Sequence, residues 1–238
     1  MENKLYGKTI IWNGDSICAG SSKTGNWATR IAQKNSMLCK NYAVGGGTIA
    51  EGLPKMKSGN DRHSVSATLD IMKEEYPEAD YIIIEGGTND ADLLGIATES
   101  AEGTRLGSFE SWDFSGSYDV NTFCGALESV FYRATKYWCG KKIGFVVAQK
   151  MGPCKEEYLN RRLYFDMAVE ICKKWGIPYI DLWNGCYLNP ELDWMFVKEN
   201  TPEKNRLENI GYYIDGQHLT GNGYDFTADI IDSWLKGI

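Results

Sequence analysis

The fold is first indicated by residues 8–16, which read Lys-Thr-Ile-Ile-Trp-Asn-Gly-Asp-Ser. The run from Lys8 to Trp12 is short and apolar, as in a buried strand, and the Asn-Gly-Asp-Ser that follows is typical of a turn. Open α/β sheets hold their sites at the carboxyl ends of their strands. Ser16 is therefore predicted to lie at the edge of the sheet where a ligand would bind.

Four more short apolar runs follow, and longer segments with helical periodicity separate them. This alternation predicts βαβ units and a parallel sheet. The predicted strands are Lys8–Trp12, Met37–Ala43, Asp80–Glu85, Lys142–Ala148 and Pro178–Leu182. The predicted helices are Gly25–Lys34, Val65–Tyr76, Asn121–Trp138, Lys155–Trp175 and Gly221–Lys236. Five strands and five helices predict a three-layer α/β/α sandwich.

Length and composition predict one domain over residues 1–238. A chain of 238 residues with 43% hydrophobic side chains can bury one sizeable core without dividing into two. The formal net charge is -7, so no basic field is present that would collect the phosphates of a nucleic acid. Nucleic-acid binding is therefore disfavoured, and the oligomeric state is not indicated.

The seven cysteines are an odd number and include no C-x-x-C pair, which fits neither a disulfide framework nor a zinc site. We expect them to be reduced and mostly buried. The N-terminus lacks the apolar core and cleavage site of a signal peptide, and no run approaches the roughly 18 apolar residues of a membrane span. These features predict a soluble cytoplasmic protein, although a chain from which a leader had been removed would look the same.

Two long segments fit neither a helix nor a strand. Residues 91–119 are rich in Gly, Ser and aromatic residues, and residues 184–214 carry two prolines with several Asn and Glu. Loops of this length in a compact domain are usually functional or disordered, and both follow the carboxyl end of a strand. Both are therefore predicted to lie over the site.

Ser16 by itself carries a weak signal, because a serine after Gly-Asp is common in turns and helix caps. The G-x-S-x-G elbow is absent from the chain, which makes an ordinary α/β-hydrolase improbable. A nucleophilic serine needs a base to take its proton and donors to hold the oxyanion.

Only two histidines could serve as that base, His63 and His218. His218 lies in Asp215-Gly216-Gln217-His218, where the carboxylate is close enough in sequence to fix the imidazole tautomer and stabilise its cation. A solvated loop histidine is the alternative for His218. His63 lies in a polar stretch with Asp61 and Arg62 and is predicted to be a surface residue.

Oxyanion donors could come from two further segments. The glycine block Gly45-Gly46-Gly47 follows the second predicted strand, and missing side chains let backbone N–H groups approach a ligand closely. After the third strand comes Gly86-Gly87-Thr88-Asn89-Asp90, where Asn89 offers a side-chain amide at the same edge. Each segment alone could instead be a tight turn.

Taken together, these four blocks resemble the SGNH, or GDSL-like, hydrolase family. They occur in the order of that family and span residues 14–218. The resemblance implies a flavodoxin-like five-stranded parallel sheet of order 2-1-3-4-5. The first block reads GDSICAG rather than the commoner GDSLT-like form, and Gly47 stands where many members have Asp, Ser or Ala, which leaves the subfamily and substrate open.

The same resemblance assigns roles to individual positions. Ser16 matches the nucleophile, and Asp215 and His218 match its acid-base partners. The oxyanion hole would be formed by the backbone N–H groups of Ser16 and Gly46 and the side chain of Asn89. Asp90 is expected to be structural, as a hydrogen-bond partner of loop backbone.

The resulting expectation is a serine esterase working by two-step acyl transfer, without a metal or organic cofactor. A thioesterase or lysophospholipase acting on longer acyl chains is one alternative, although both long loops lack the aliphatic run that a fatty chain would need. A non-catalytic module with the same fold that binds a carbohydrate is another alternative. An activated serine would distinguish the enzymes from the binding module.

The expected substrate is a short acyl ester, most simply an acetyl group, on a sugar or similarly polar alcohol. Aromatic residues interleave with Asp and Asn in the two long loops, and flat rings beside polar groups suit a sugar ring. Trp112, Trp183 and Tyr213 are the predicted substrate-binding residues. The alternative is that these aromatic side chains only pack the loops onto the body.

Overall fold

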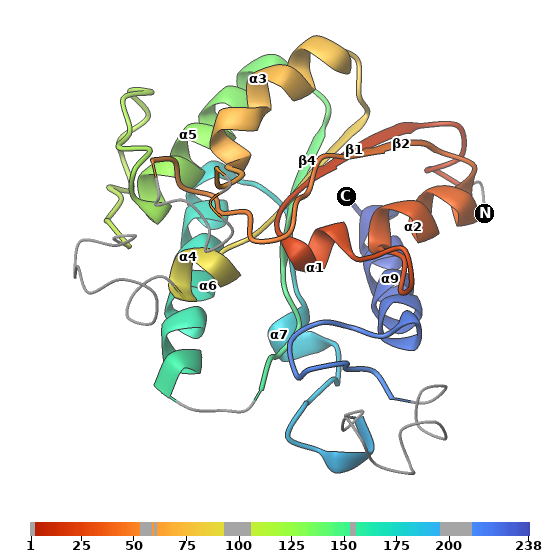
Figure 1. The fold of residues 1–238 in the computed structure, drawn as a ribbon. Helices are drawn as coiled ribbons and strands as arrows, with labels where there is room; N and C mark the ends of the chain where they lie inside the picture. The colour runs from red at the N-terminus through yellow and green to blue at the C-terminus, as the bar shows by residue number, and fades with distance from the viewer. Residues whose placement is uncertain (1–2, 53–58, 60, 93–105, 153–155, 196–210) are drawn as a thin grey trace.

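Five parallel strands form one sheet in the computed structural model, which describes residues 3–52, 59, 61–92, 106–152, 156–195 and 211–238 (Figure 1). The strand order is β2-β1-β3-β4-β5, with every neighbouring pair parallel. The strands are β1 (Thr9–Asn13), β2 (Leu38–Asn41), β3 (Tyr81–Glu85), β4 (Lys142–Val147) and β5 (Tyr179–Asp181). The order 2-1-3-4-5 expected from the sequence is confirmed.

Helices cover both faces of this sheet. The helices on one side are α2 (Trp27–Asn35) and α9 (Gly221–Leu235), and those on the other are α3 (Val65–Glu75), α5 (Phe123–Tyr137) and α6 (Glu156–Trp175) (Figure 1). The indole of Trp27 donates to the Thr227 hydroxyl at 2.8 Å and so joins α2 to α9. The predicted three-layer α/β/α sandwich is confirmed.

Four helices begin where a polar side chain caps the first turn. Each capping oxygen accepts a backbone N–H three residues along, one of the donors that a helix start leaves unpaired. The capping residues are Asn26 for α2, Ser64 for α3, Thr122 for α5 and Thr220 for α9. Local sequence therefore sets these starts, within two residues of the predicted ones at α2, α3, α5 and α9.

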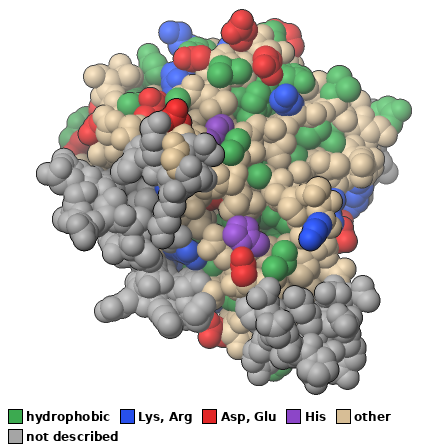
Figure 2. Space-filling view, in the orientation of Figure 1, with side chains coloured by type: hydrophobic (Ala, Val, Ile, Leu, Met, Phe, Trp, Pro, Cys, Tyr) green, Lys and Arg blue, Asp and Glu red, His purple; other side chains and the backbone are tan. Residues whose placement is uncertain are grey.

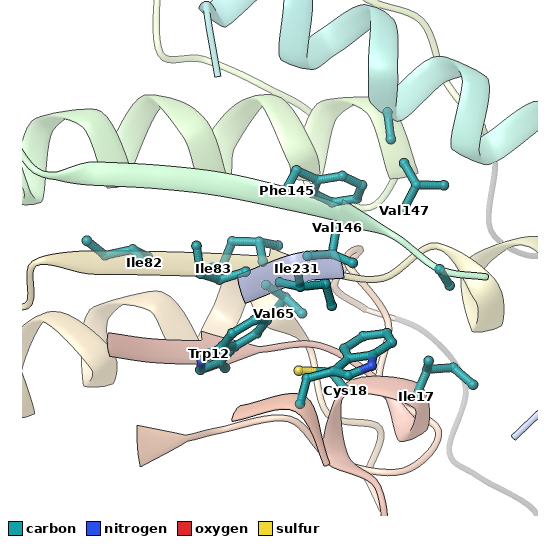
Figure 3. Close-up of a cluster of buried hydrophobic side chains, with 14 of the residues drawn as sticks. Trp12, Ile17, Cys18, Val65, Ile82, Ile83, Phe145, Val146, Val147 and Ile231 are labelled. Atoms are coloured by element: carbon teal, nitrogen blue, oxygen red, sulfur yellow. The ribbon is translucent and has the colours of Figure 1, made fainter. Parts of the chain in front are cut away.

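The core lies along the central strands. Every residue of β3 is buried, whereas β2 is an edge strand in which exposed and half-buried residues alternate. Trp12, Ile83 and Phe145 from three adjacent strands lie in one cluster with Ile17 and Cys18 of the short helix α1 (Ser16–Ala19) (Figure 3). Burial of each large apolar side chain contributes roughly 1.5–3 kcal/mol, so α1 is anchored to the sheet through its own core residues.

Short helices directly follow three strands at the carboxyl edge. They are α1 after β1, α4 (Thr88–Asp92) after β3, and α7 (Leu182–Gly185) after β5, with a 3-10 helix η1 (Asp193–Met195) further on. Elements of four or five residues are too short to show helical periodicity, so the sequence did not predict them. They bring Ser16 and Asn89 to the same edge of the sheet.

The described cysteines are free thiols, and Cys18, Cys124, Cys172 and Cys186 are buried. This agrees with the expectation that they are reduced and mostly buried. No helix within the described ranges is both long and apolar enough to cross a membrane.

The described part of the first long loop packs in part against α5 and α6, and residues 93–105 of this predicted loop lie outside the described part of the chain. Lys174, 3% exposed in its side chain, donates to the Glu128 carboxylate at 2.5 Å and to the Asp113 carbonyl at 2.6 Å. The ring of Phe114 lies 4.9 Å from the same ammonium group. Lys174 lies in the last turn of α6, at the amino edge of the sheet, so this buried cation holds residues 109–118 against α5 and α6.

Candidate active site

Ser16, His218 and Asp215 form a hydrogen-bonded chain at the carboxyl edge. The Oγ of Ser16 lies 2.9 Å from Nε2 of His218, and Nδ1 of His218 lies 2.7 Å from Oδ2 of Asp215. With Nδ1 donating its proton to the carboxylate, Nε2 is left to accept the serine proton. The structure therefore brings together the serine hydroxyl, the imidazole and the carboxylate that the sequence analysis singled out.

The first turn of α1 fixes Ser16. Asp15 is the N-cap, and its carboxylate accepts the N–H of Ile17 at 2.8 Å. The N–H of Gly20 donates to the Ser16 carbonyl at 3.0 Å, and the Tyr224 hydroxyl donates to the Ile17 carbonyl at 2.7 Å. With both ends of this turn bonded, the backbone N–H of Ser16 is presented at the start of a helix, where an anion is favoured.

Local hydrogen bonds shape the loop that carries His218. The Asp215 carboxylate accepts the backbone N–H groups of Gln217 at 3.0 Å and His218 at 2.7 Å, besides binding the imidazole. Gly216 sits between them with φ of +83°, a conformation that glycine adopts without strain. This turn explains the Asp-Gly-x-His spacing, because one carboxylate holds the backbone and the ring together.

The same loop is tied to the end of β4. The side chain of Gln149 donates to the Gln217 carbonyl at 2.8 Å, and the N–H of Gly152 donates to the Gly216 carbonyl at 2.8 Å. The guanidinium of Arg161, from α6, donates to the Gln217 side chain at 3.1 Å. These contacts help to set the distance between α1 and the loop of residues 215–218, which come from opposite ends of the chain.

The electrostatics of the pair suit a base and its partner. The hydrogen bond with Asp215 raises the pKa of His218 above its ordinary value of 6.5, against the opposing effect of burial. Burial by itself would raise the pKa of Asp215, but its hydrogen bonds with His218 outweigh burial and the pKa falls to about 2. Asp215 is therefore ionised at neutral pH and stabilises a protonated imidazole.

The glycine block after β2 lies directly beside Ser16. The N–H of Val44 donates to the Gly14 carbonyl at 3.2 Å, and a side chain at Gly45 would lie 3.9 Å from the Cβ of Ser16. Gly46 has φ of +77°. Absent side chains and a left-handed glycine thus let this backbone pass close to Ser16.

Asn89, on α4, reaches the same block. Its side-chain nitrogen donates to the carbonyl oxygen of Gly47 at 2.8 Å. Next to it, the buried carboxyl of Asp90 accepts the N–H groups of Ile49 at 2.9 Å and Ala50 at 3.1 Å. The sequence expectation that Asp90 binds loop backbone agrees with this, and its burial raises its pKa to about 7. Residues 47–50 are therefore held by both residues of the Asn-Asp pair.

His63 is not a free surface residue, which corrects the prediction from its polar neighbours. Its Nε2 lies 2.9 Å from Oδ1 of Asn13, a fully buried side chain at the end of β1. Burial lowers the pKa of His63, so the ring stays neutral at pH 7. The adjacent Arg62 donates to the Gly46 carbonyl at 2.7 Å. Residues 62–63 thus support the glycine block, a role that no local signal in the sequence marks.

The three predicted substrate-binding aromatics do not meet at Ser16. Tyr213 is fully buried, and its hydroxyl donates to the Lys150 carbonyl at 2.6 Å. Trp183 is also buried and packs against Phe165, with ring centroids 5.5 Å apart. Trp112 is 76% exposed on the loop that Lys174 holds toward the amino edge. The first two are core residues, so the alternative that they pack the loops onto the body is correct for them.

Over its described part, the second long loop lies beside the loop that carries Asp215 and His218. A side chain at Gly152 would meet Pro190 at 2.7 Å, and the N–H of Tyr212 donates to the Met195 carbonyl at 3.0 Å. Residues 196–210 of this predicted loop lie outside the described part of the chain. Two large aromatic side chains in it are exposed, Tyr187 at 87% and Trp194 at 65%.

Both histidines reach the surface on one face of the molecule (Figure 2). Within the described ranges, no group of three or more His, Cys, Asp or Glu side chains is arranged to hold a metal ion. The groups gathered around Ser16 are an imidazole, a carboxylate, an amide and backbone N–H donors.

Comparison with known proteins gives a likeness in structure. No protein-family model matches the sequence, and no curated protein matches it. A protein from Lactobacillus plantarum superposes with a TM-score of 0.70 at 18% identity over 98% of each chain. A protein described as a GDSL-like lipase, from Bacteroides ovatus, gives 0.59 at 16% identity over 98% of this chain and 99% of that one. The carbohydrate acetylesterase Est24 from Sinorhizobium meliloti gives 0.62 at 12% identity, covering 97% and 99%.

These superpositions extend over almost the whole of each chain and include the five-stranded sheet with its flanking helices. The chain therefore has the fold of SGNH/GDSL-like hydrolases.

Proposed function

We propose that this chain is a serine esterase that hydrolyses short acyl esters by way of an acyl-enzyme. The observation that carries the proposal is the continuous Ser16–His218–Asp215 hydrogen-bond chain, with separations of 2.9 and 2.7 Å. A serine that only forms a turn or cap does not need a histidine aligned on its hydroxyl. A solvated loop histidine does not need a serine hydroxyl or a carboxylate as a partner. Nucleophilic catalysis needs both.

In the first step, Ser16 Oγ attacks the ester carbonyl carbon while Nε2 of His218 takes the hydroxyl proton. The carbonyl oxygen gains the negative charge, and the proposed donors for it are the N–H groups of Ser16 and Gly46 and the amide of Asn89. Collapse of this intermediate breaks the bond to the alcohol, which leaves with the proton from His218. The products of the step are a free alcohol and an acyl group on Ser16.

In the second step, water attacks the acyl group on Ser16. His218 takes a proton from that water, and the new oxyanion occupies the same donors. The intermediate then releases the carboxylic acid as Ser16 Oγ takes the proton back. Asp215 remains ionised throughout and stabilises the imidazolium in both steps.

The substrate that we propose is an acetyl ester of a sugar or similar polar alcohol. Trp194 and Tyr187 are exposed in the loop beside the catalytic loop, and they support a sugar site better than the buried Trp183 and Tyr213 do. Tyr187 has φ of +61°, an uncommon conformation for a tyrosine, and its side chain is exposed. The likeness to Est24, which is named a carbohydrate acetylesterase, supports the same substrate class.

Hydrolysis of nitrophenyl esters from acetate to decanoate, followed by acetate release from acetylated oligosaccharides, tests this proposal. We expect acetate to be cleaved fastest and the Ser16→Ala variant to be inactive. Trp194→Ala should weaken hydrolysis of the acetylated sugar with little effect on nitrophenyl acetate. Fastest turnover on octanoate or longer, without acetate release from any sugar, would favour a thioesterase or lysophospholipase. Absence of any hydrolysis would favour the carbohydrate-binding module.

A further inference from the structure

Two carboxyl groups are buried behind Ser16, and neither takes part in the acyl-transfer steps. Asp15 precedes the nucleophile, and Glu85 is the last residue of β3; both are 0% exposed. The backbone N–H of Asp15 donates to Oε2 of Glu85 at 3.2 Å. A side chain from the central strand therefore holds the backbone of the turn that carries Ser16.

Gly14 leaves the space in which Glu85 makes this contact. A Cβ at position 14 would lie 2.6 Å from Oε2 of Glu85 and 2.9 Å from both the Glu85 carbonyl oxygen and the Cβ of Cys18. Two of these three atoms belong to the backbone or to a Cβ in α1, and neither can move without shifting its element. The glycine of Gly-Asp-Ser is therefore needed for the approach of the Glu85 carboxyl to the turn.

The hydrogen bonds around the two carboxyls leave one donor missing. Asp15 Oδ1 accepts the Ile17 N–H and Glu85 Oε2 accepts the Asp15 N–H, whereas Asp15 Oδ2 and Glu85 Oε1 have no partner among the described residues. Buried acceptors without a donor are costly, and two adjacent buried carboxylates repel each other. A proton on one carboxyl removes the second charge and supplies the donor.

The surroundings of the pair offer no permanent cation as an alternative. The groups that face it within the described ranges are Thr88 and Asp90 on α4, Cys18 on α1, Tyr224 on α9, and His218 in the catalytic loop. Of these, His218 alone becomes positive, and only when it is protonated. A proton on one of the two carboxyl groups is therefore what keeps the pair from carrying two negative charges.

The environment indicates which carboxyl holds that proton. Burial raises the pKa of both, and the charge of Asp15 raises the pKa of Glu85 further. The hydrogen bond from the Ile17 N–H and the neighbouring Thr88 hydroxyl act in the opposite direction on the pKa of Asp15. Asp15 is thus the group that is ionised, and Glu85 is the group that keeps its proton.

We propose that Glu85 is a positioning residue that works as a neutral carboxylic acid: its O–H donates to the Asp15 carboxylate while its carbonyl oxygen accepts the Asp15 N–H. The catalytic consequence rests on the proposed esterase function. One negative charge, that of Asp15, then lies behind the nucleophile and helps to raise the pKa of His218. A second charge at Glu85 would oppose the oxyanion that forms in front of the same helix start.

Denaturant unfolding at pH 5, 6, 7 and 8 tests the protonation of Glu85 without reference to activity. Glu85→Gln keeps one acceptor and one donor in a neutral group of the same size. Because the folded pKa is raised, the native state binds more protons than the unfolded state above pH 4.5, so the wild type loses stability as pH rises. We expect the unfolding constant of the wild type, relative to Glu85→Gln, to rise by up to about tenfold per pH unit. Glu74→Gln, an exposed site on α3, is the matched control without this trend.

The proposal would be overturned if the unfolding constant of the wild type relative to Glu85→Gln changed with pH no more than its value relative to Glu74→Gln. Glu85 would then be ionised in the fold. This result is independent of catalysis. A chain that hydrolyses no ester but shows the expected trend would contradict the proposed function and leave the neutral Glu85 in place.

The pH profile of kcat/KM identifies which partner carries the charge. Asp15→Asn should move the acid limb to lower pH, because His218 loses a nearby negative charge, whereas Glu85→Gln should leave the limb where it is. The opposite pattern would show that Asp15 is the acid, contrary to the proposal. Glu85→Ala should lower kcat with little change in KM, and Glu85→Gln should restore it. Equal losses in both variants would contradict a role for the neutral hydrogen bonds.

Discussion

The side-chain amide of Asn89 donates to the carbonyl oxygen of Gly47 at 2.8 Å, so the helix after β3 holds the loop after β2. An amide nitrogen carries two N–H groups, and this bond uses one of them. In the proposed mechanism, the other binds the oxyanion that forms on Ser16. Asn89 thereby places the glycine block and, in that mechanism, also contributes a donor of its own.

Asn89→Ala is expected to lower kcat by about 10²- to 10³-fold with a smaller change in KM, because an oxyanion donor acts mainly in the transition state. Steady-state kinetics on nitrophenyl acetate give both constants. Asn89→Asp is the matched variant, since it keeps the size but removes both donors and should be at least as impaired. A loss confined to KM would show that Asn89 binds substrate instead.

Substitution of the two histidines is expected to affect different properties, activity for His218 and stability for His63. His218→Ala should remove nearly all activity. His63→Ala should keep most activity but lose about 1 kcal/mol of stability, since it deletes a hydrogen bond to the buried Asn13. Urea unfolding and nitrophenyl acetate kinetics on both variants separate the two effects. Comparable losses of activity at both positions would contradict the assignment of His218 as the base.

The pH dependence of hydrolysis follows from the environment of His218. The working base is neutral, and the hydrogen bond with Asp215 raises the pKa of His218 above 6.5. Activity should therefore increase with pH through a midpoint above 6.5. Asp215→Asn should lower that midpoint and kcat together, because the carboxylate both raises the pKa and orients the ring. A rate that is flat from pH 5 to 8 would be inconsistent with a histidine base.

Asp90→Asn is expected to destabilise the protein by about 1–3 kcal/mol, because an amide has one oxygen and cannot accept both backbone N–H groups of residues 49 and 50. Thermal or urea unfolding gives this difference. Asp119→Asn, at an exposed loop position, is a suitable control. A stability change no larger than that of the control would mean that the two backbone bonds contribute little.

The sheet could be predicted from the sequence because its strands are apolar runs buried on both faces. β3 shows this most plainly, with Tyr-Ile-Ile-Ile-Glu fully buried. The edge strand β2 alternates in exposure, and its predicted limits at Met37 and Ala43 were correspondingly too wide. The contact between Asp215 and His218 was predictable for a different reason, since the two residues are close in sequence and one turn brings them together.

Contacts between residues far apart in the chain could not be predicted where no family motif pairs the two residues. His63 lies in a polar segment, and its partner Asn13 is 50 positions away. Glu85 looks like the polar end of a strand until its contact with Asp15, 70 positions earlier, is known. The prediction of substrate-binding aromatic side chains is limited for a related reason. The sequence shows that Tyr213 is aromatic but not whether its ring faces the core or the solvent.

The central claim is that His218 and Asp215 activate Ser16 as a nucleophile. Reaction with a fluorophosphonate followed by mass spectrometry of the peptides tests it most directly. We expect one adduct, on the peptide that contains Ser16, formed at a rate that falls at least about 10²-fold in His218→Ala, in line with the contribution of a positioned general base. An unmodified Ser16 after prolonged exposure, or labelling at an unchanged rate in His218→Ala, would contradict the claim.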